Sequence, residues 1–106
     1  MMQLTPENFK ERVLQADKPV LIDFYADWCG PCRQIFPVLN NLEHEMDGKA
    51  LLYKVDIAVQ NELSVQHNVS HIPLLVFYNK GKEVRRIVGG ATKSQLKDQL
   101  NSMMNS

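Results

Sequence analysis

The sequence predicts an α/β protein in which one mixed β-sheet carries helices on both faces, and three observations predict it. An apolar run, Val20–Ala26, is interrupted only by Asp23, which is the pattern of a strand covered on both faces. Helix-like segments separate this strand from the next, and strands joined through helices pair in parallel. Later, two strand-like segments flank a short glycine-containing turn, which adds antiparallel pairing.

The first expected element is a helix over Pro6–Gln15. Thr5 is a good N-cap, and proline is well tolerated at the first helical position. Leu4 and Phe9 are placed to pack against each other across the start of this helix as a hydrophobic staple. The strand Val20–Ala26 follows, and we expect it at the centre of the sheet.

An apolar stripe predicts the second helix. Its residues recur at spacings of four, three and four: Ile35, Leu39, Leu42 and Met46. Gly48 then offers a left-handed cap for the end of the helix. Pro37 lies inside the stripe, where it lacks an N–H donor and crowds the preceding turn. We therefore expect one kinked helix and not two separate helices.

The remaining strands follow in the second half of the chain. Leu51–Asp56 is the next strand, and a short helix over Val59–His67 ends at Asn68, which tolerates the left-handed conformation. The hairpin joins Leu74–Asn79 to Glu83–Val88 through a Lys-Gly-Lys turn with glycine at the tight position.

The last helix begins after a capping box formed by Thr92 and Gln95. Its apolar face carries Leu96, Leu100 and Met103. The chain contains no internal repeat, linker or low-complexity segment. We therefore expect residues 1–106 to form a single domain.

Composition and charge exclude several function classes. A chain of 106 residues with 44% hydrophobic and 23% charged residues is typical of one soluble globular domain. Twelve basic residues balance twelve acidic ones, so the net charge provides no electrostatic footprint for nucleic acid or anionic lipid. The N-terminus lacks the pattern of a signal peptide, and no apolar run approaches the roughly 20 residues of a membrane span. We expect a cytoplasmic protein that binds neither nucleic acid nor membrane, although the mature form of an exported protein would look the same.

The two cysteines of the chain, Cys29 and Cys32, follow the carboxyl end of the first strand, the edge where function gathers in such sheets. This spacing places the sulfur of Cys29 at a helix N-terminus, where free amides and the helix dipole favour a negative charge. Cys32 lies within the first turn, close enough to attack a mixed disulfide on Cys29. Gly30 lets a partner approach, and Pro31 fixes the backbone. The pattern predicts Cys29 as nucleophile and Cys32 as resolving thiol.

Two other interpretations of the cysteines are less favoured. A static disulfide that closes so short a loop would constrain the unfolded chain very little. A zinc site could use His67 and His71, but a helix, a strand and another helix separate them from the cysteines, where finger patterns have about 12 residues. We therefore expect no metal, and we expect His44, His67 and His71 to be surface or loop-packing residues.

Three separated segments resemble the thioredoxin family. Asp23–Cys32 resembles its active-site strand and motif, His71–Gly81 its later proline loop and strand, and Val88–Gly90 the glycine turn before its last helix. The resemblance covers nearly the whole chain. It implies the thioredoxin fold, a central mixed sheet flanked by helices on both faces, and no cofactor besides a redox-active Cys29–Cys32 disulfide.

The resemblance also implies roles for individual residues of the active site. Cys29 would be exposed and Cys32 buried, with Gly30 and Pro31 helping to set the reduction potential. Asp23 would be the buried aspartate that accepts and returns the proton of Cys32. Burial in an apolar strand would raise the pKa of that carboxyl, which suits a general base. The alternative is an aspartate at a strand end that is turned to water.

Further residues enter through the same resemblance. Lys54 on the neighbouring strand would lie near Asp23, although an exposed strand lysine is an alternative. Pro73 would be preceded by a cis peptide bond beside the sulfurs. A shallow apolar groove for an extended substrate chain would be lined by Trp28, Ile72, Pro73 and Gly89, any of which could instead serve packing alone.

The sequence departs from the usual family pattern at three positions. His71 stands where a small residue is frequent, Leu74 where threonine is common, and Tyr25 where tryptophan is frequent. These departures leave the dithiol chemistry intact and bear on which partners the protein prefers.

Three functions compete. The leading hypothesis is a protein disulfide reductase that takes electrons from a thioredoxin reductase, delivers them to disulfides in client proteins, and acts as a monomer. The same fold could serve as an oxidase or isomerase, because the reduction potential depends on thiolate stability. A non-catalytic binding or scaffold subunit is the third. The presence of both cysteines, Asp23 and Pro73 argues against that third hypothesis.

Overall fold

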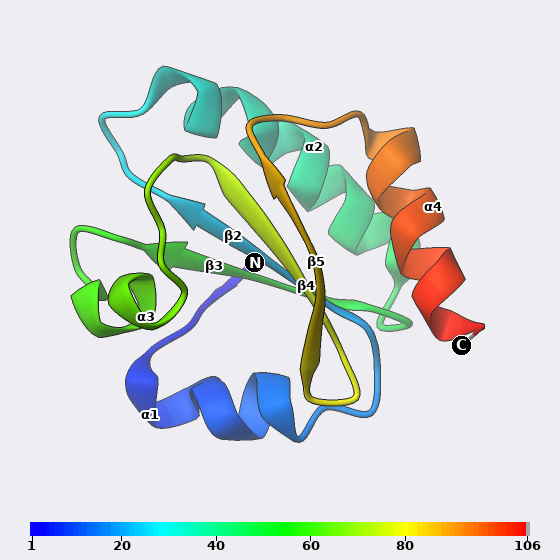
Figure 1. Cartoon of the computed structure of the whole chain (residues 1–106). Helices are drawn as coiled ribbons and strands as arrows, with labels where there is room; N and C mark the ends of the chain where they lie inside the picture. Colours follow the sequence, from blue (N-terminus) through cyan, green and yellow to red (C-terminus); the bar gives the residue numbers. More distant parts are fainter. Residues whose placement is uncertain (106) are drawn as a thin grey trace.

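The computed structural model describes residues 1–105 as a five-stranded sheet with helices on both sides (Figure 1). The strands are β1 (Met2–Gln3), β2 (Val20–Tyr25), β3 (Leu51–Asp56), β4 (Leu74–Asn79) and β5 (Lys82–Val88). The helices are α1 (Pro6–Phe9), the π-helix η1 (Lys10–Leu14), α2 (Gly30–Met46), α3 (Asn61–Gln66) and α4 (Lys93–Met104). The predicted α/β class is confirmed.

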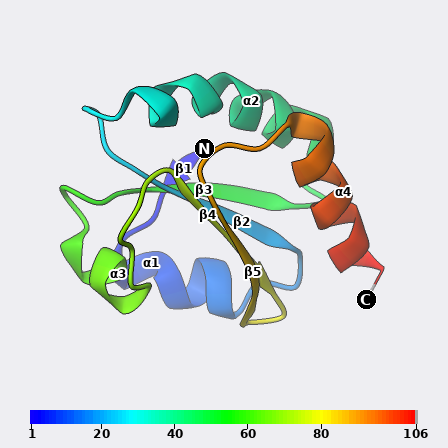
Figure 2. The same cartoon turned by 45° about the horizontal axis from the view of Figure 1, so that its top comes forward.

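The sheet is mixed, in the order β1-β3-β2-β4-β5. β1 and β2 pair with β3 in parallel, whereas β4 pairs antiparallel with both β2 and β5. β2 is the central strand, as predicted. The helices α1 and α3 cover one face, and α2 and α4 cover the other (Figures 1 and 2).

Side-chain alternation on β2 determines which residues face each layer of helices. Val20, Ile22 and Phe24 pack with residues of α1 and α3, whereas Leu21 packs with residues of α2 and α4. Because successive side chains of a strand point to opposite faces, Asp23 points to the same side as Leu21. The buried carboxyl therefore lies beneath α2, the helix that begins at the cysteines.

The predicted first helix, Pro6–Gln15, has two parts. The Thr5 cap is confirmed, with a capping box completed by Asn8. After Phe9, however, the chain continues as the π-helix η1 and ends at Leu14. Nothing in the helical pattern distinguishes the two kinds of turn.

Helix α2 runs without interruption through Pro37, which confirms one helix and not two. Its end differs slightly from the expectation: Asp47 adopts the left-handed conformation with φ 47°, one residue before Gly48. The proline removes one donor in the second turn, but the apolar stripe on α2 still buries against the sheet. That packing outweighs the local break.

One strand was missed, and other element boundaries differ from the predictions. Strand β1 was missed, because two residues are too few to show an alternating pattern. Strand β2 ends at Tyr25, and the short helix expected over Val59–His67 begins only at Asn61 because a turn follows β3. The hairpin turn consists of two residues, so β5 begins at Lys82. Shifts of one or two residues at element ends are ordinary.

No described helix, over residues 1–105, is long and apolar enough to cross a membrane.

Candidate active site

The two cysteines occupy the first turn of α2 and are joined by a disulfide bond. Cys29 is the N-cap of the helix, and its Sγ accepts a hydrogen bond from the backbone N–H of Cys32 at 3.2 Å. The Cα atoms of the pair are 5.2 Å apart. Backbone donors at a helix start have no partner within the helix, so they can stabilise a sulfur anion at this position. The predicted placement of both sulfurs at the helix start is confirmed.

Cys29 is more enclosed than the resemblance implied. Cys32 is fully buried as expected, but only 6% of the surface of Cys29 is accessible. The expectation of an exposed Cys29 is therefore wrong for this disulfide form. Cys29 is covered because it packs in a cluster with Tyr25 and Ala26, and its Sγ lies 4.0 Å from the carbonyl oxygen of Ile72.

Asp23 is completely buried, and neither of its carboxylate oxygens has a hydrogen-bond partner within residues 1–105. Burial raises the pKa of this carboxyl from 3.8 to about 7, and the nearby positive charge of Lys54 opposes that rise. A carboxyl with a pKa near neutrality can both accept and return a proton. Asp23 is therefore not turned to water, although its role toward Cys32 stays a prediction.

A row of polar residues crosses the sheet beside Asp23. Gln3 of β1, Lys54 of β3 and Asp23 of β2 lie in register on neighbouring parallel strands. The Nζ of Lys54 is 6.0 Å from the ring centroids of both Tyr25 and Phe36, within the range of a cation–π interaction. The half-buried Lys54 thus connects the carboxyl of Asp23 with the aromatic cluster around the disulfide.

Tyr25 is held by a contact that sequence reasoning missed. Its hydroxyl accepts a hydrogen bond from Nε2 of Gln3 at 2.9 Å, and Oε1 of Gln3 accepts one from the backbone N–H of Asp56 at 3.0 Å. The ring of Tyr25 meets that of Phe36 edge-on, with centroids 4.9 Å apart. No signal in the sequence could have located Gln3, because its partners are 22 and 53 residues away.

The residues expected to line a substrate groove lie around the disulfide in two groups. The Ile72–Pro73 peptide bond is cis, and the carbonyl of Pro73 accepts a hydrogen bond from the N–H of Gly89 at 2.8 Å. This bond ties the proline loop to the turn after β5, while Ile72 packs against the disulfide cluster. Trp28 is 72% exposed beside Cys29, a large apolar surface without packing. An exposed aromatic next to a reactive centre suits contact with a partner chain.

The three histidines divide into two exposed residues and one packed residue. His44 and His71 are exposed, but His67 is buried on the opposite face of the sheet. Its Nδ1 lies 2.9 Å from the carbonyl oxygen of Leu63, and its Nε2 lies 2.8 Å from the hydroxyl of Tyr78. His67 lies in the turn that ends α3 but is not a surface residue, and two ring hydrogen bonds satisfy it where it packs into the core, as the loop-packing alternative expects.

The residues considered for zinc are not brought together. His67 lies in the core across the sheet from the cysteines, and His71 pairs with the hydroxyl of Ser70 at 3.1 Å. Within residues 1–105, no group of three or more His, Cys, Asp or Glu side chains is placed to hold a metal ion.

Comparison with known proteins identifies related chains. A family model described as Thioredoxin matches residues 1–102. Thioredoxin C-2 of Corynebacterium nephridii is 42% identical over 96 residues, which cover 91% of this chain and 89% of the relative. Thioredoxin 1 of a Nostoc species is 37% identical over 98 residues, 92% of each chain. The thioredoxin of Alicyclobacillus acidocaldarius is 37% identical over 103 residues, 97% of each chain.

Proposed function

Because the chain belongs to the thioredoxin family, it is a thiol-disulfide oxidoreductase, and we propose that Cys29 attacks the client disulfide while Cys32 releases the reduced product. The observation that carries these roles is the geometry of the first turn of α2. Cys29 caps the helix and accepts a hydrogen bond from the backbone N–H of Cys32, and Cys32 is fully buried. A client can therefore reach only the outer of the two sulfurs.

The reaction proceeds in two exchanges. In the reduced protein, the thiolate of Cys29 attacks one sulfur of the client disulfide, forms a mixed disulfide and expels the other client sulfur as a thiolate. Cys32 then loses its proton and attacks the sulfur of Cys29. The Cys29–Cys32 disulfide forms, the second client thiol leaves, and two electrons have passed to the client.

Asp23 is proposed to take the proton that Cys32 loses. The support is its burial beneath α2, its two unpaired oxygens and a pKa raised to about 7. A base of this strength shares a proton with a thiol more readily than an ordinary carboxylate does. Lys54, whose charge opposes the rise in that pKa, is proposed to tune the proton affinity.

The client chain is proposed to lie in an extended form across Trp28, Ile72, the cis Pro73 and Gly89. The exposure of Trp28 and the hydrogen bond between Pro73 and Gly89 support this placement. Gly30 and Pro31, both exposed in the first turn, leave the approach to Cys29 open and help to set the reduction potential.

The redox group is the chain's own disulfide, and we propose that no other cofactor is needed. We expect electrons to come from a thioredoxin reductase, and disulfide-containing proteins to be the clients. We also expect the protein to act as a monomer, in the cytoplasm, as residues 1–106 folded in one domain. These expectations rest on the family and on the composition of the chain.

Insulin reduction tests the proposed roles. With a dithiol as electron donor, the parent protein should accelerate the turbidity that follows cleavage of the insulin disulfides, and Cys29→Ser should not. Cys32→Ser should form a mixed disulfide with its client and then stop. A Cys29→Ser variant that retained the parent rate would contradict the assignment of Cys29 as nucleophile, whereas a parent protein without this activity would favour a scaffold role.

A further inference from the structure

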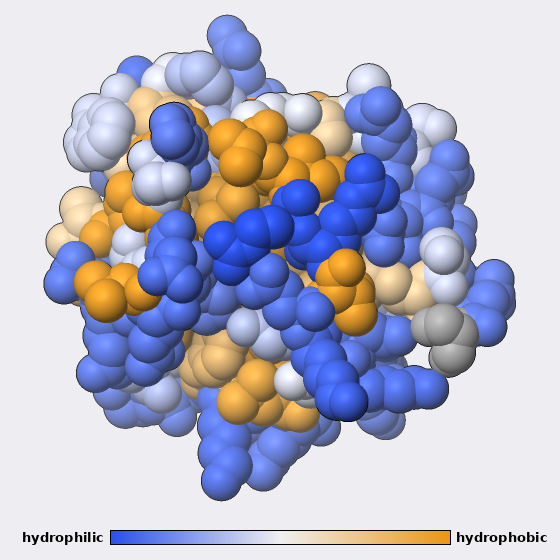
Figure 3. Space-filling view, viewed as in Figure 1, coloured by the Kyte–Doolittle hydropathy of each residue, from blue (hydrophilic) through white to orange (hydrophobic). Residues whose placement is uncertain are grey.

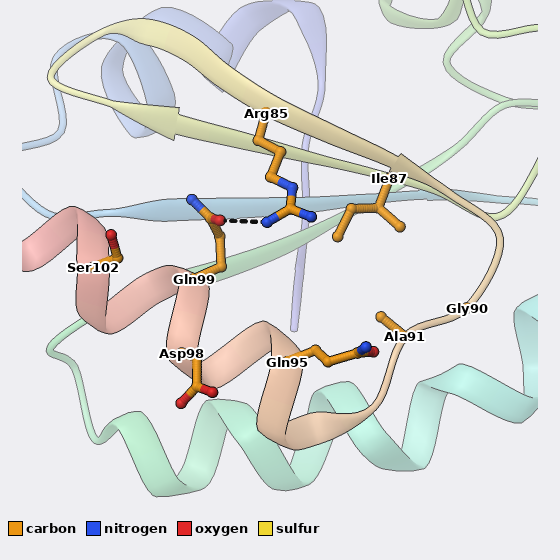
Figure 4. A pocket seen from close by; sticks show the side chains of 8 residues that line it. All are labelled: Arg85, Ile87, Gly90, Ala91, Gln95, Asp98, Gln99 and Ser102. Carbon is orange, nitrogen blue, oxygen red and sulfur yellow. Dashed lines mark hydrogen bonds between the residues drawn. The ribbon is translucent and has the colours of Figure 1, made fainter.

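A hollow of about 460 Å³ lies between β5 and α4, away from the disulfide (Figure 4). Arg85 and Ile87 of β5 form one wall, and Gln95 and Gln99 of α4 form the other. The disulfide exchange does not use these residues; Arg85 and Gln95 are exposed, and Ile87 and Gln99 are half-buried. The lining therefore combines polar side chains with the apolar side chains of Ile87 and Ala91.

Arg85 presents unused hydrogen-bond donors in this hollow. Its Nη1 donates to Oε1 of Gln99 at 2.7 Å, and this is the one hydrogen bond of its guanidinium within residues 1–105. A guanidinium carries five N–H donors in a fixed, planar fork. Figure 4 shows the group extending toward α4 between Gln99 and Ile87, whereas the carboxylate of Asp98, which also lines the hollow, is directed away from Arg85 toward α2. The charge aimed into the hollow is therefore positive.

The neighbouring Arg86 on the same strand makes three hydrogen bonds through its guanidinium, where Arg85 makes one. Arg85 pairs across the sheet with Phe77 and Arg86 with Val76, so the two arginines lie on opposite faces of β5. Arg86 donates to both carboxylate oxygens of Glu83, at 2.7 and 2.9 Å, and to the carbonyl of His67 at 2.9 Å. The guanidinium of Arg86 is therefore held by contacts within the protein, whereas most donors of Arg85 are not used in this way.

The hollow continues toward the cysteines. A second hollow of about 250 Å³ shares Gly90 and Ala91 with the first. Its other walls come from α2: Pro31, Gln34, Ile35 and Val38. Figure 3 shows hydrophobic side chains gathered over the end of β5 and the adjoining part of α2, with strongly hydrophilic ones across the middle of β5. A continuous surface thus leads from Pro31, two residues after Cys29, to Arg85.

We propose that Arg85, assisted by Gln99, binds an acidic side chain of the client protein at a distance from the disulfide being reduced. The inference rests on the proposed function, because the exchange at Cys29 is what places the client chain beside Pro31. From there the client crosses the apolar surface at Gly90 and Ala91 and brings a carboxylate to the guanidinium. Two N–H donors of one arginine match the two oxygens of a carboxylate. A lysine at the same place in the client would be repelled.

A series of synthetic peptides tests this proposal. Each peptide closes one disulfide in an otherwise uncharged sequence and carries a single Glu, Gln or Lys, placed at successive positions on either side of the attacked cysteine. The measured quantity is the second-order rate constant for oxidation of the reduced protein by each peptide. At the matching position we expect Glu to react about threefold to fivefold faster than Gln, the size of an exposed ion pair, and Lys to react more slowly. The preference should fade as salt is raised.

Three variants make the result specific. Arg85→Gln should lose the preference for Glu while it reduces the Gln peptides at the parent rate. Arg86→Gln and Lys82→Gln remove the same charge from the same strand, and both should keep the preference. Lys82→Gln serves as the control if Arg86→Gln disturbs the hairpin.

Three outcomes would overturn the subsite. In the first, Glu is favoured at no position of the peptide. In the second, Arg85→Gln keeps the preference for Glu, and in the third, Lys82→Gln loses that preference to the same extent as Arg85→Gln. Failure of the proposed function looks different, because the parent protein would then reduce none of the peptides, the uncharged ones included.

Discussion

Asp23 places an ionisable group where the central strand otherwise carries apolar side chains. It has no accessible surface, and neither oxygen is hydrogen-bonded within residues 1–105. A buried, unpaired carboxylate is costly, so the folded protein favours the neutral acid and the pKa rises to about 7. A residue that weakens the fold near neutral pH is expected at a functional site.

The free energy of unfolding of the oxidised protein should depend on pH because Asp23 is buried. The folded state binds the proton of Asp23 more tightly than the unfolded state does. The contribution of this proton to stability is therefore fully present below pH 3.8 and is lost as the pH rises through about 7. A pKa change from 3.8 to about 7 corresponds to about 4 kcal/mol. Asp23→Asn, which cannot ionise, should therefore be more stable than the parent by up to that amount at pH 8 and should converge with it near pH 4. Denaturant unfolding measures the difference, and a pH-independent difference would refute this interpretation.

The same residue should affect one step of the exchange and not the other. In Asp23→Asn, the release of the second client thiol at pH 7 should slow by about 100-fold, a usual contribution of a general base. The formation of the mixed disulfide by Cys29 should keep its rate. Rapid quenching of a single turnover separates the two steps. Equal slowing of both would mean that the substitution perturbs the helix start and does not remove a base.

Tyr25 links the N-terminal strand to the disulfide cluster through a single hydroxyl. Tyr25→Phe keeps the ring against Phe36 and removes the bond to Gln3, so it should cost about 1 kcal/mol of unfolding free energy. Gln3→Ala should cost at least as much, because the N–H of Asp56 also loses its acceptor. The double variant should cost less than the sum of the two, measured by denaturant unfolding. Strict additivity would show that the two side chains do not interact.

At the scale of elements, the turn between β4 and β5 packs closely against the end of η1. Gly81 has φ 82°, and a Cβ on it would lie 2.7 Å from the carbonyl oxygen of Leu14 at the end of η1. A side chain is thus opposed both by the backbone conformation and by a neighbouring backbone atom that has little freedom to move.

Two glycines of nearly equal φ separate these causes. Gly48 has φ 81°, but among residues 1–105 no neighbouring atom lies within 4 Å of a Cβ added to it. Gly48→Ala should therefore cost about 1 kcal/mol, the backbone strain alone. Gly81→Ala should cost about 2 kcal/mol more, because η1 and the hairpin must move apart. Thermal unfolding of the two variants measures the difference. Equal losses would mean that the contact with Leu14 relaxes freely.

Elements with strong local signals were predictable, and those set by contacts were not. The capping box at Thr92, the uninterrupted stripe through Pro37 and the left-handed Asn68 all act within a few residues. The two-residue strand β1 is defined by its pairing with β3, far along the chain, and no local pattern marks the π-helical turn of η1. A sequence read in local windows does not contain that information.

For the whole molecule, the reacting pair was predictable because its chemistry follows from local spacing. Two cysteines separated by two residues, after a buried strand and before a helix, determine where both sulfurs lie. Gln3, His67 and Arg85 were not predictable as partners, because each takes its role from strands and helices that meet only in the folded chain. The reaction centre is thus determined by nearby residues in the sequence, whereas its surroundings are determined by how the strands and helices come together.

The most direct test concerns the sulfur at the start of α2. In the reduced protein, the alkylation rate of Cys29 is measured against pH with a small reagent, in parallel with a simple free thiol. Amides at the helix start should stabilise the thiolate, so Cys29 should reach its half-maximal rate at a lower pH than the free thiol. A profile at the same or a higher pH would contradict the proposed stabilisation of the Cys29 thiolate by the helix start.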